Sequence, residues 1–191
     1  MKKTTIGIIT IGTLLLSPIA SAHMGPPHIH NSLADGVTHP FSGLDHLVML
    51  LAIGVMAQHL NDAKKAMMMI ATTMMVMLAG LVLGAQFAGA PSVEALITGS
   101  LFIAAFSLWN QARTGNNMKK MLLNVASVAL ILFHGWAHGA EFNGSSLVSF
   151  SLGMCFSSVV IMSMGFYAAR FIPTKLLAKV TAVCGVIVAF A

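Results

Sequence analysis

The sequence predicts an all-α integral membrane protein, a bundle of about six transmembrane helices that follows a cleaved signal peptide. Three observations predict this fold class. First, the 191 residues are 57% hydrophobic and only 8% charged, with a mean hydropathy of +0.87. A chain with so few polar residues cannot cover a soluble core, so apolar surface must face lipid. The other two observations are a secretory leader and a series of long apolar runs that short polar connections separate.

Residues 1–22 have the pattern of a secretory signal peptide. A basic start at Lys2 and Lys3 and an apolar stretch over residues 6–16 precede an Ala-x-Ala cleavage site that ends at Ala22. We therefore predict that the mature chain begins at His23. The alternative is that the leader remains as an uncleaved first helix.

Residues 23–43 form the next predicted segment, a periplasmic N-terminal stretch that contains Pro and Gly and is expected to be a flexible tail. It carries His23, His28, His30 and His39. A histidine-rich tract can capture metal ions, although a tail can also carry histidines that bind nothing. Both interpretations of the tail histidines stay open.

Residues 44–191 form the predicted transmembrane domain, in which long apolar windows mark the spans. The six windows are residues 44–60, 66–87, 93–112, 121–138, 146–169 and 176–191. The last window is the shortest. Gly80 and Gly84 in the second window, and Gly135 and Gly139 in the fourth, are four residues apart, which predicts that neighbouring helices approach closely there.

The cations of the connections predict the orientation of the spans. They lie only in or beside the first, third and fifth connections, at Lys64, Lys65, Arg113, Lys119, Lys120, Arg170, Lys175 and Lys179. By the positive-inside rule these connections face the cytoplasm, which leaves the mature N-terminus outside. We therefore predict a multi-pass protein of the bacterial inner membrane with a periplasmic N-terminus, in agreement with the signal peptide.

The net charge and the cysteines exclude two other interpretations. The formal charge is +5 and the sequence pI about 9.6, but the basic residues form small separated groups. A nucleic-acid partner would need them gathered on one face, so we predict none. Cys155 and Cys184 lie inside apolar runs without metal-ligand or redox spacing, and we interpret them as small buried hydrophobic residues.

Two motifs place ionisable groups at the outer ends of two spans. "HPFSGLDH" brings His39, Asp45 and His46 to the start of the first span, and "FHGWAHGAE" lies at the end of the fourth. At about 100° per residue, the histidines of the second motif share one helical stripe with its glutamate if the helix continues past the second glycine. These three residues are His134, His138 and Glu141. The sequence thus brings six candidate ligands to one membrane depth.

The chemistry of these groups points to a metal ion. Ionisable residues inside a membrane are costly and mark pathways or sites. Imidazole and carboxylate together suit divalent first-row metals such as nickel, cobalt, zinc or iron. Asp45 can be a direct ligand or can orient a histidine through its second ring nitrogen. The methionines of the second window could add thioethers, but consecutive residues point all around a helix, so we expect most of them to meet lipid and neighbouring helices.

With these two motifs the sequence resembles the HupE/UreJ family, whose members accompany hydrogenase and urease systems and are regarded as nickel or cobalt permeases. The resemblance covers the whole chain. It implies that His39, Asp45, His46, His134, His138 and Glu141 handle the metal. The methionine-rich second span departs from the family pattern.

The predicted function is a secondary transporter, not an enzyme, that takes up a divalent transition metal, with Ni²⁺ first and Co²⁺ second. The metal is the transported substrate, and no prosthetic group is expected. The expected partners are the lipid bilayer and a hydrogenase or urease maturation system. Two alternatives stay open: a membrane-embedded zinc-dependent hydrolase, because three histidines and a carboxylate can hold a catalytic zinc, and an accessory protein that binds metal without moving it.

Overall fold

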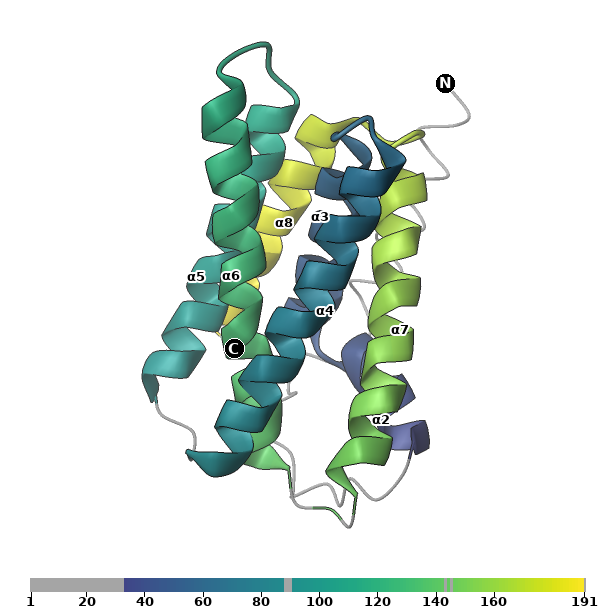
Figure 1. Cartoon of the computed structure of the whole chain (residues 1–191). Coiled ribbons are helices and arrows are strands. Elements are labelled where there is room, and N and C mark those ends of the chain that lie inside the picture. The colour runs from purple at the N-terminus through teal and green to yellow at the C-terminus, as the bar shows by residue number, and fades with distance from the viewer. Residues whose placement is uncertain (1–32, 88–90, 143, 145, 191) are drawn as a thin grey trace.

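A computed structural model describes residues 33–87, 91–142, 144 and 146–190, and the described part is all helical (Figure 1). Its helices are α2 (Leu33–Ser42), α3 (Leu44–Gln58), α4 (Ala63–Gln86), α5 (Pro91–Gln111), α6 (Asn117–Glu141), α7 (Leu147–Ala168) and α8 (Thr174–Ala189). The predicted signal peptide and His23, His28 and His30 lie outside the described residues. The predicted all-α membrane fold is confirmed.

A helix stands at each of the six apolar windows. Four of them, α4 to α7, are long and apolar enough to cross a membrane, and α2 with α3 qualifies as a fifth, broken span. With 16 residues, α8 rises about 24 Å, less than the hydrocarbon core of about 30 Å. The sixth span therefore stays a prediction.

The segment before the first window differs from the flexible tail that the sequence predicts. Its residues Leu33–Ser42 form α2, which packs against α7. The two helices meet at Gly36 and Gly153, where an added methyl group on either would overlap the backbone of the other. After α2 the chain turns by 83° into α3. Pro40 removes a backbone donor in the last turn of α2, and Gly43 is extended, so the helix cannot continue straight.

Helix α3 occupies the centre of the bundle. It contacts α2 and all five of the later helices, and nearly every residue from Asp45 to Ala57 is buried. A helix that is apolar all round is stable only when it is enclosed on every side. The enclosure buries the polar first turn of α3 as well, and Asp45 and His46 are only 4% and 3% exposed.

Helices α4 and α6 run in the same direction and pack at glycines, as the spacing predicts. An added methyl group at Gly80 or Gly84 would overlap the α6 backbone, and one at Gly135 or Gly139 would overlap the α4 backbone. The contact is therefore made by main chain on both sides. It fixes the position of α6, which carries the second histidine motif.

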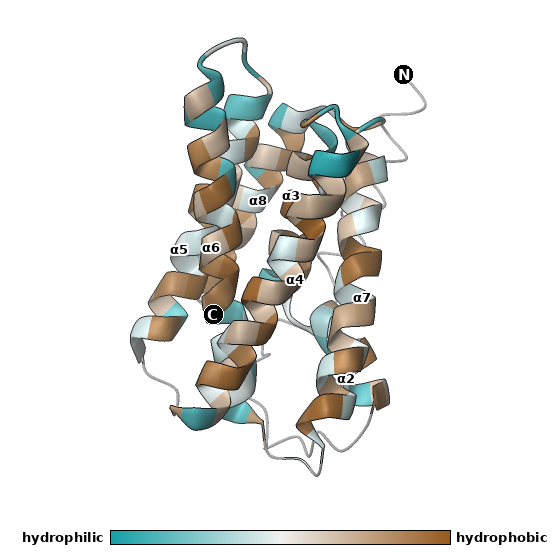
Figure 2. Cartoon of the chain, in the orientation of Figure 1, coloured by the Kyte–Doolittle hydropathy of each residue, from teal (hydrophilic) through white to brown (hydrophobic). Residues whose placement is uncertain are grey.

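The outer surface and the two ends of the bundle have different chemistry. Large apolar side chains are exposed along the sides, including Met75, Leu122, Val125, Leu152 and Phe156, which suits contact with lipid (Figure 2). All lysines and arginines of the described residues lie at one end, in or beside the connections α3–α4, α5–α6 and α7–α8. This is the upper end in Figure 1, and α2 lies toward the other. We call the upper end the cationic end.

Candidate metal site

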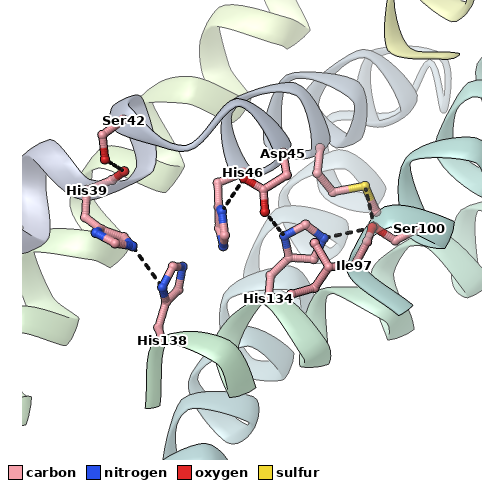
Figure 3. Close-up of polar contacts among 9 residues, drawn as sticks. His39, Ser42, Asp45, His46, Ile97, Ser100, His134 and His138 are labelled. Carbon is pink, nitrogen blue, oxygen red and sulfur yellow. Dashed lines mark hydrogen bonds and ion pairs between the residues drawn. The ribbon is translucent and has the colours of Figure 1, made fainter. Parts of the chain in front are cut away.

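The structure brings together five of the six residues that the two motifs nominate. His39 comes from α2, Asp45 and His46 from the first turn of α3, and His134 and His138 from the last turns of α6 (Figure 3). All except the partly exposed His39 are buried. The cluster lies at the bend between α2 and α3, away from the cationic end.

Asp45 lies between two imidazole rings. Its Oδ1 is 3.0 Å from Nδ1 of His46, and its Oδ2 is 4.0 Å from Nδ1 of His134. An ionised carboxylate can only accept hydrogen bonds, so Nδ1 of His46 carries the proton. The other nitrogen of that ring, Nε2, then has a free lone pair, and it is buried with no hydrogen-bond partner among the described residues.

His39 orients His138 in the same manner. Nε2 of His39 is 2.9 Å from Nδ1 of His138, so one ring donates to the other. Nε2 of His138 is buried and has no hydrogen-bond partner among the described residues. If His138 donates through Nδ1, this second nitrogen keeps its lone pair. Phe150 packs against both rings and covers them on the α7 side.

Ser100 of α5 orients His134, and the sequence gives no signal for it. Its Oγ lies 2.6 Å from the carbonyl oxygen of Ile97 and 2.9 Å from Nε2 of His134. These two contacts hold the hydroxyl between α5 and the His134 ring and fix the orientation of that ring. The other ring nitrogen, Nδ1 of His134, faces Oδ2 of Asp45 at 4.0 Å.

Replacing Ser100 with alanine is expected to lower metal affinity by about tenfold or more, because partners that orient a ligating histidine typically contribute this much. Without the hydroxyl, the His134 ring can rotate or change tautomer. Equilibrium Ni²⁺ binding to the purified chain measures the effect. Ser107→Ala is the matched control, since it removes a buried hydroxyl that the same helix directs at Asn124. Equal affinities for both variants would contradict this role of Ser100.

Asp45, His46 and His134 are close enough to share one ion, and the ring of His138 packs against the other side of His46. Figure 3 shows His46 between His138 and His134, and its ring centroid is 4.2 Å and 4.8 Å from theirs. One candidate ligand atom from each of Asp45, His46 and His134 lies within 4.8 Å of the others. Neutral imidazole with one carboxylate suits Ni²⁺, Co²⁺ or Zn²⁺.

Glu141, the sixth nominated residue, does not belong to this close group. The helix does continue past Gly139, as the stripe requires, but Glu141 is its last residue and its side chain is exposed. His138 and His134 lie about one and two turns before the end of this helix. The structure thus leaves Glu141 at the surface beside the site.

The structure explains why the first motif has a glycine at position 43. A Cβ atom there would lie 2.9 Å from Oδ1 of Asp45 and 3.0 Å from Nδ1 of His46. These are the two atoms that form the carboxylate–imidazole contact. Any larger residue would have to displace that pair, so the glycine preserves the geometry of the site.

Comparisons with known proteins agree with the two motifs. The family described as HupE / UreJ protein matches residues 11–191. The chain is 30% identical over 166 residues to "Protein HupE" of Rhizobium leguminosarum bv. viciae. The aligned residues make up 85% of this chain and 83% of the relative. No solved structure matches the chain. With the family matched over nearly its whole length, and with both motifs meeting at one buried site, the chain belongs to the HupE/UreJ family.

Proposed function

We propose that this chain is a permease that takes up a divalent first-row metal ion across the bacterial inner membrane, with Ni²⁺ as the first candidate and Co²⁺ as the second. The observation that carries the proposal is the buried cluster of His46, His134, His138 and Asp45 within a multi-pass bundle. Buried ionisable groups in a membrane protein are costly and persist where an ion or proton uses them.

The hydrogen bonds around the cluster support a site built from oriented imidazole rings and Asp45. Asp45, His39 and Ser100 each engage one nitrogen of a different ring. The second nitrogens of these rings are Nε2 of His46, Nε2 of His138 and Nδ1 of His134, and they are the candidate ligands. In this arrangement Asp45 mainly orients His46 and balances part of the ion's charge. Of the two roles predicted for Asp45, direct ligand and orienting residue, this is the orienting one.

The location of the cluster supports uptake rather than export. The cationic end belongs in the cytoplasm by the positive-inside rule, so the bend between α2 and α3 faces the periplasm. His39 is the one histidine of the cluster that is partly exposed, and it would meet the ion first. His23, His28 and His30 precede it in the chain, and capture of the ion by these tail histidines is part of the proposal.

The membrane potential is sufficient to drive this transport. Moving one elementary charge through 100 mV yields about 2.3 kcal/mol, so a dication gains about 4.6 kcal/mol. A uniporter therefore needs no second driving ion. Delivery of the metal to a hydrogenase or urease maturation system is the corresponding role in the cell, in keeping with the family resemblance.

Uptake of radioactive Ni²⁺ into proteoliposomes tests the proposal. With an inside-negative potential, we expect saturable uptake that liposomes without protein do not show and that collapses when the potential is removed. Excess Co²⁺ should compete and excess Mg²⁺ should not. Tight Ni²⁺ binding without uptake would instead indicate an accessory protein that binds metal.

A further inference from the structure

A narrow cavity leads from the histidine cluster toward the cationic end. Its lining residues are Pro40, His46, Leu50, Met77, Ile131, His134, His138, Met154 and Ser158. Because α3 and α7 run toward the cationic end, Leu50 and Ser158 lie about one helical turn beyond His46 and Met154. The cavity therefore begins at the imidazoles and continues between thioethers.

Two methionines from different helices form the continuation. Met77 of α4 and Met154 of α7 are both fully enclosed, at 1% and 0% exposure. Met77 lies against α6 beside His134, since a methyl group at Gly135 would meet its carbonyl oxygen. The Met77 sulfur points inward, because it lies 4.0 Å from Oγ of Ser158 on α7.

Met77 differs from the methionines of α4 that face outward. Met67, Met68 and Met75 are 60 to 70% exposed on the outer surface, where the sequence predicts that they meet lipid. Met77 is the member of the run that the helix turns into the cavity. Its partner Met154 follows Phe150, which covers His39 and His138, by one turn.

On this basis we infer that the thioethers of Met77 and Met154 form a second ligand step, which receives the metal ion from the histidines and passes it toward the cytoplasm. This inference rests on the proposed transport function. The cavity is too narrow for a water molecule, so a passing ion must exchange its histidine ligands for groups of the wall. The wall offers two sulfurs and the Ser158 hydroxyl.

Thioether chemistry suits a transfer step better than a storage site. A thioether is neutral, so it binds a dication more weakly than a carboxylate does and releases it more readily, and multi-site pathways need such weak steps. It carries no proton that must leave first, unlike imidazole. As a soft ligand it disfavours the hard ions Mg²⁺ and Ca²⁺, which prefer oxygen ligands. The step therefore adds selectivity that the histidines and Asp45 alone would not supply.

The test replaces both sulfurs without changing the packing. Met77→Leu with Met154→Leu keeps volume and hydrophobicity, and such exchanges are well tolerated in cores. The matched control is Met56→Leu with Met162→Leu, because these methionines are also 0% exposed on α3 and α7 but do not line the cavity. Each chain is assayed for equilibrium Ni²⁺ binding in detergent and for Ni²⁺ uptake into proteoliposomes at a fixed potential.

We expect the cavity variant to bind Ni²⁺ with unchanged affinity, since the histidines remain. We expect its uptake rate to be about one tenth of the wild-type rate or lower. The control should match the wild type in both assays. If the wild type takes up Ni²⁺ and the cavity variant takes it up as fast as the control variant, the thioether step is wrong and the permease proposal still holds. If the wild type binds Ni²⁺ but moves none, the permease proposal fails, and this route fails with it.

Discussion

Replacing His46 with alanine is expected to abolish high-affinity Ni²⁺ binding and to reduce uptake to that of empty liposomes. His46 is the middle ring of the cluster, with the rings of His134 and His138 on its two sides. Its loss removes one nitrogen ligand and also removes the ring against which both neighbours pack. We expect the affinity to fall by about 100-fold or more, because even residues that only orient a metal ligand contribute about 10- to 100-fold.

His59 provides the matched control for this variant. It belongs to the other end of the same helix, at the C-cap of α3, where its ring nitrogens lie 3.0 Å from the Val55 carbonyl oxygen and 3.1 Å from Oγ1 of Thr174. His59→Ala removes the same side chain 13 residues away and should retain Ni²⁺ affinity. A His46→Ala chain that folds and still binds Ni²⁺ like His59→Ala would refute the proposed site.

The sequence predicts the helices well because their signal is local. Each apolar window becomes a helix whose ends lie within a few residues of the prediction, since apolar length alone identifies a segment that must avoid water. The close approach of α4 and α6 was also accessible from the sequence. Glycines four residues apart remove side-chain bulk from one helical face whatever the rest of the fold does.

The bend before α3 was not accessible in this way. Pro and Gly in the motif indicate an interruption, but an extended tail and a packed helix are both compatible with them. The choice depends on α7, where Gly153 leaves room for α2 at Gly36. That contact joins residues more than a hundred positions apart in sequence, and no periodicity within either segment reports it.

The residues of the candidate site were likewise predictable from the sequence only in part. His39, Asp45, His46, His134 and His138 were nominated because ionisable residues stand out against an apolar background. Ser100 was missed because serine is common in membrane helices and its role arises only from its contact with His134. Met77 was hidden for the opposite reason, since it is one of several methionines in α4, and only the packing shows which of them faces inward.

The glycine contact between α4 and α6 predicts a large effect of a single added methyl group. Gly84→Ala is expected to destabilise the bundle by about 1–3 kcal/mol or more. The new Cβ would overlap the Trp136 carbonyl group and approach the Ala140 amide. These are backbone atoms, which no rotamer change can remove, so α4 and α6 must move apart. Because α6 carries His134 and His138, we expect weaker Ni²⁺ binding as well as a lower melting temperature in detergent.

Gly99→Ala makes the same chemical change where space is available. A Cβ at Gly99, inside α5, meets no atom within 4 Å. Alanine is favoured over glycine in a helix by about 1 kcal/mol, so this variant should be as stable as the wild type or more so, and should bind Ni²⁺ normally. The two variants have opposite expected signs, which separates close packing from helix propensity. If both variants raised the melting temperature, α4 and α6 would not be in backbone contact. Some other contact would then have to hold the second motif beside the first.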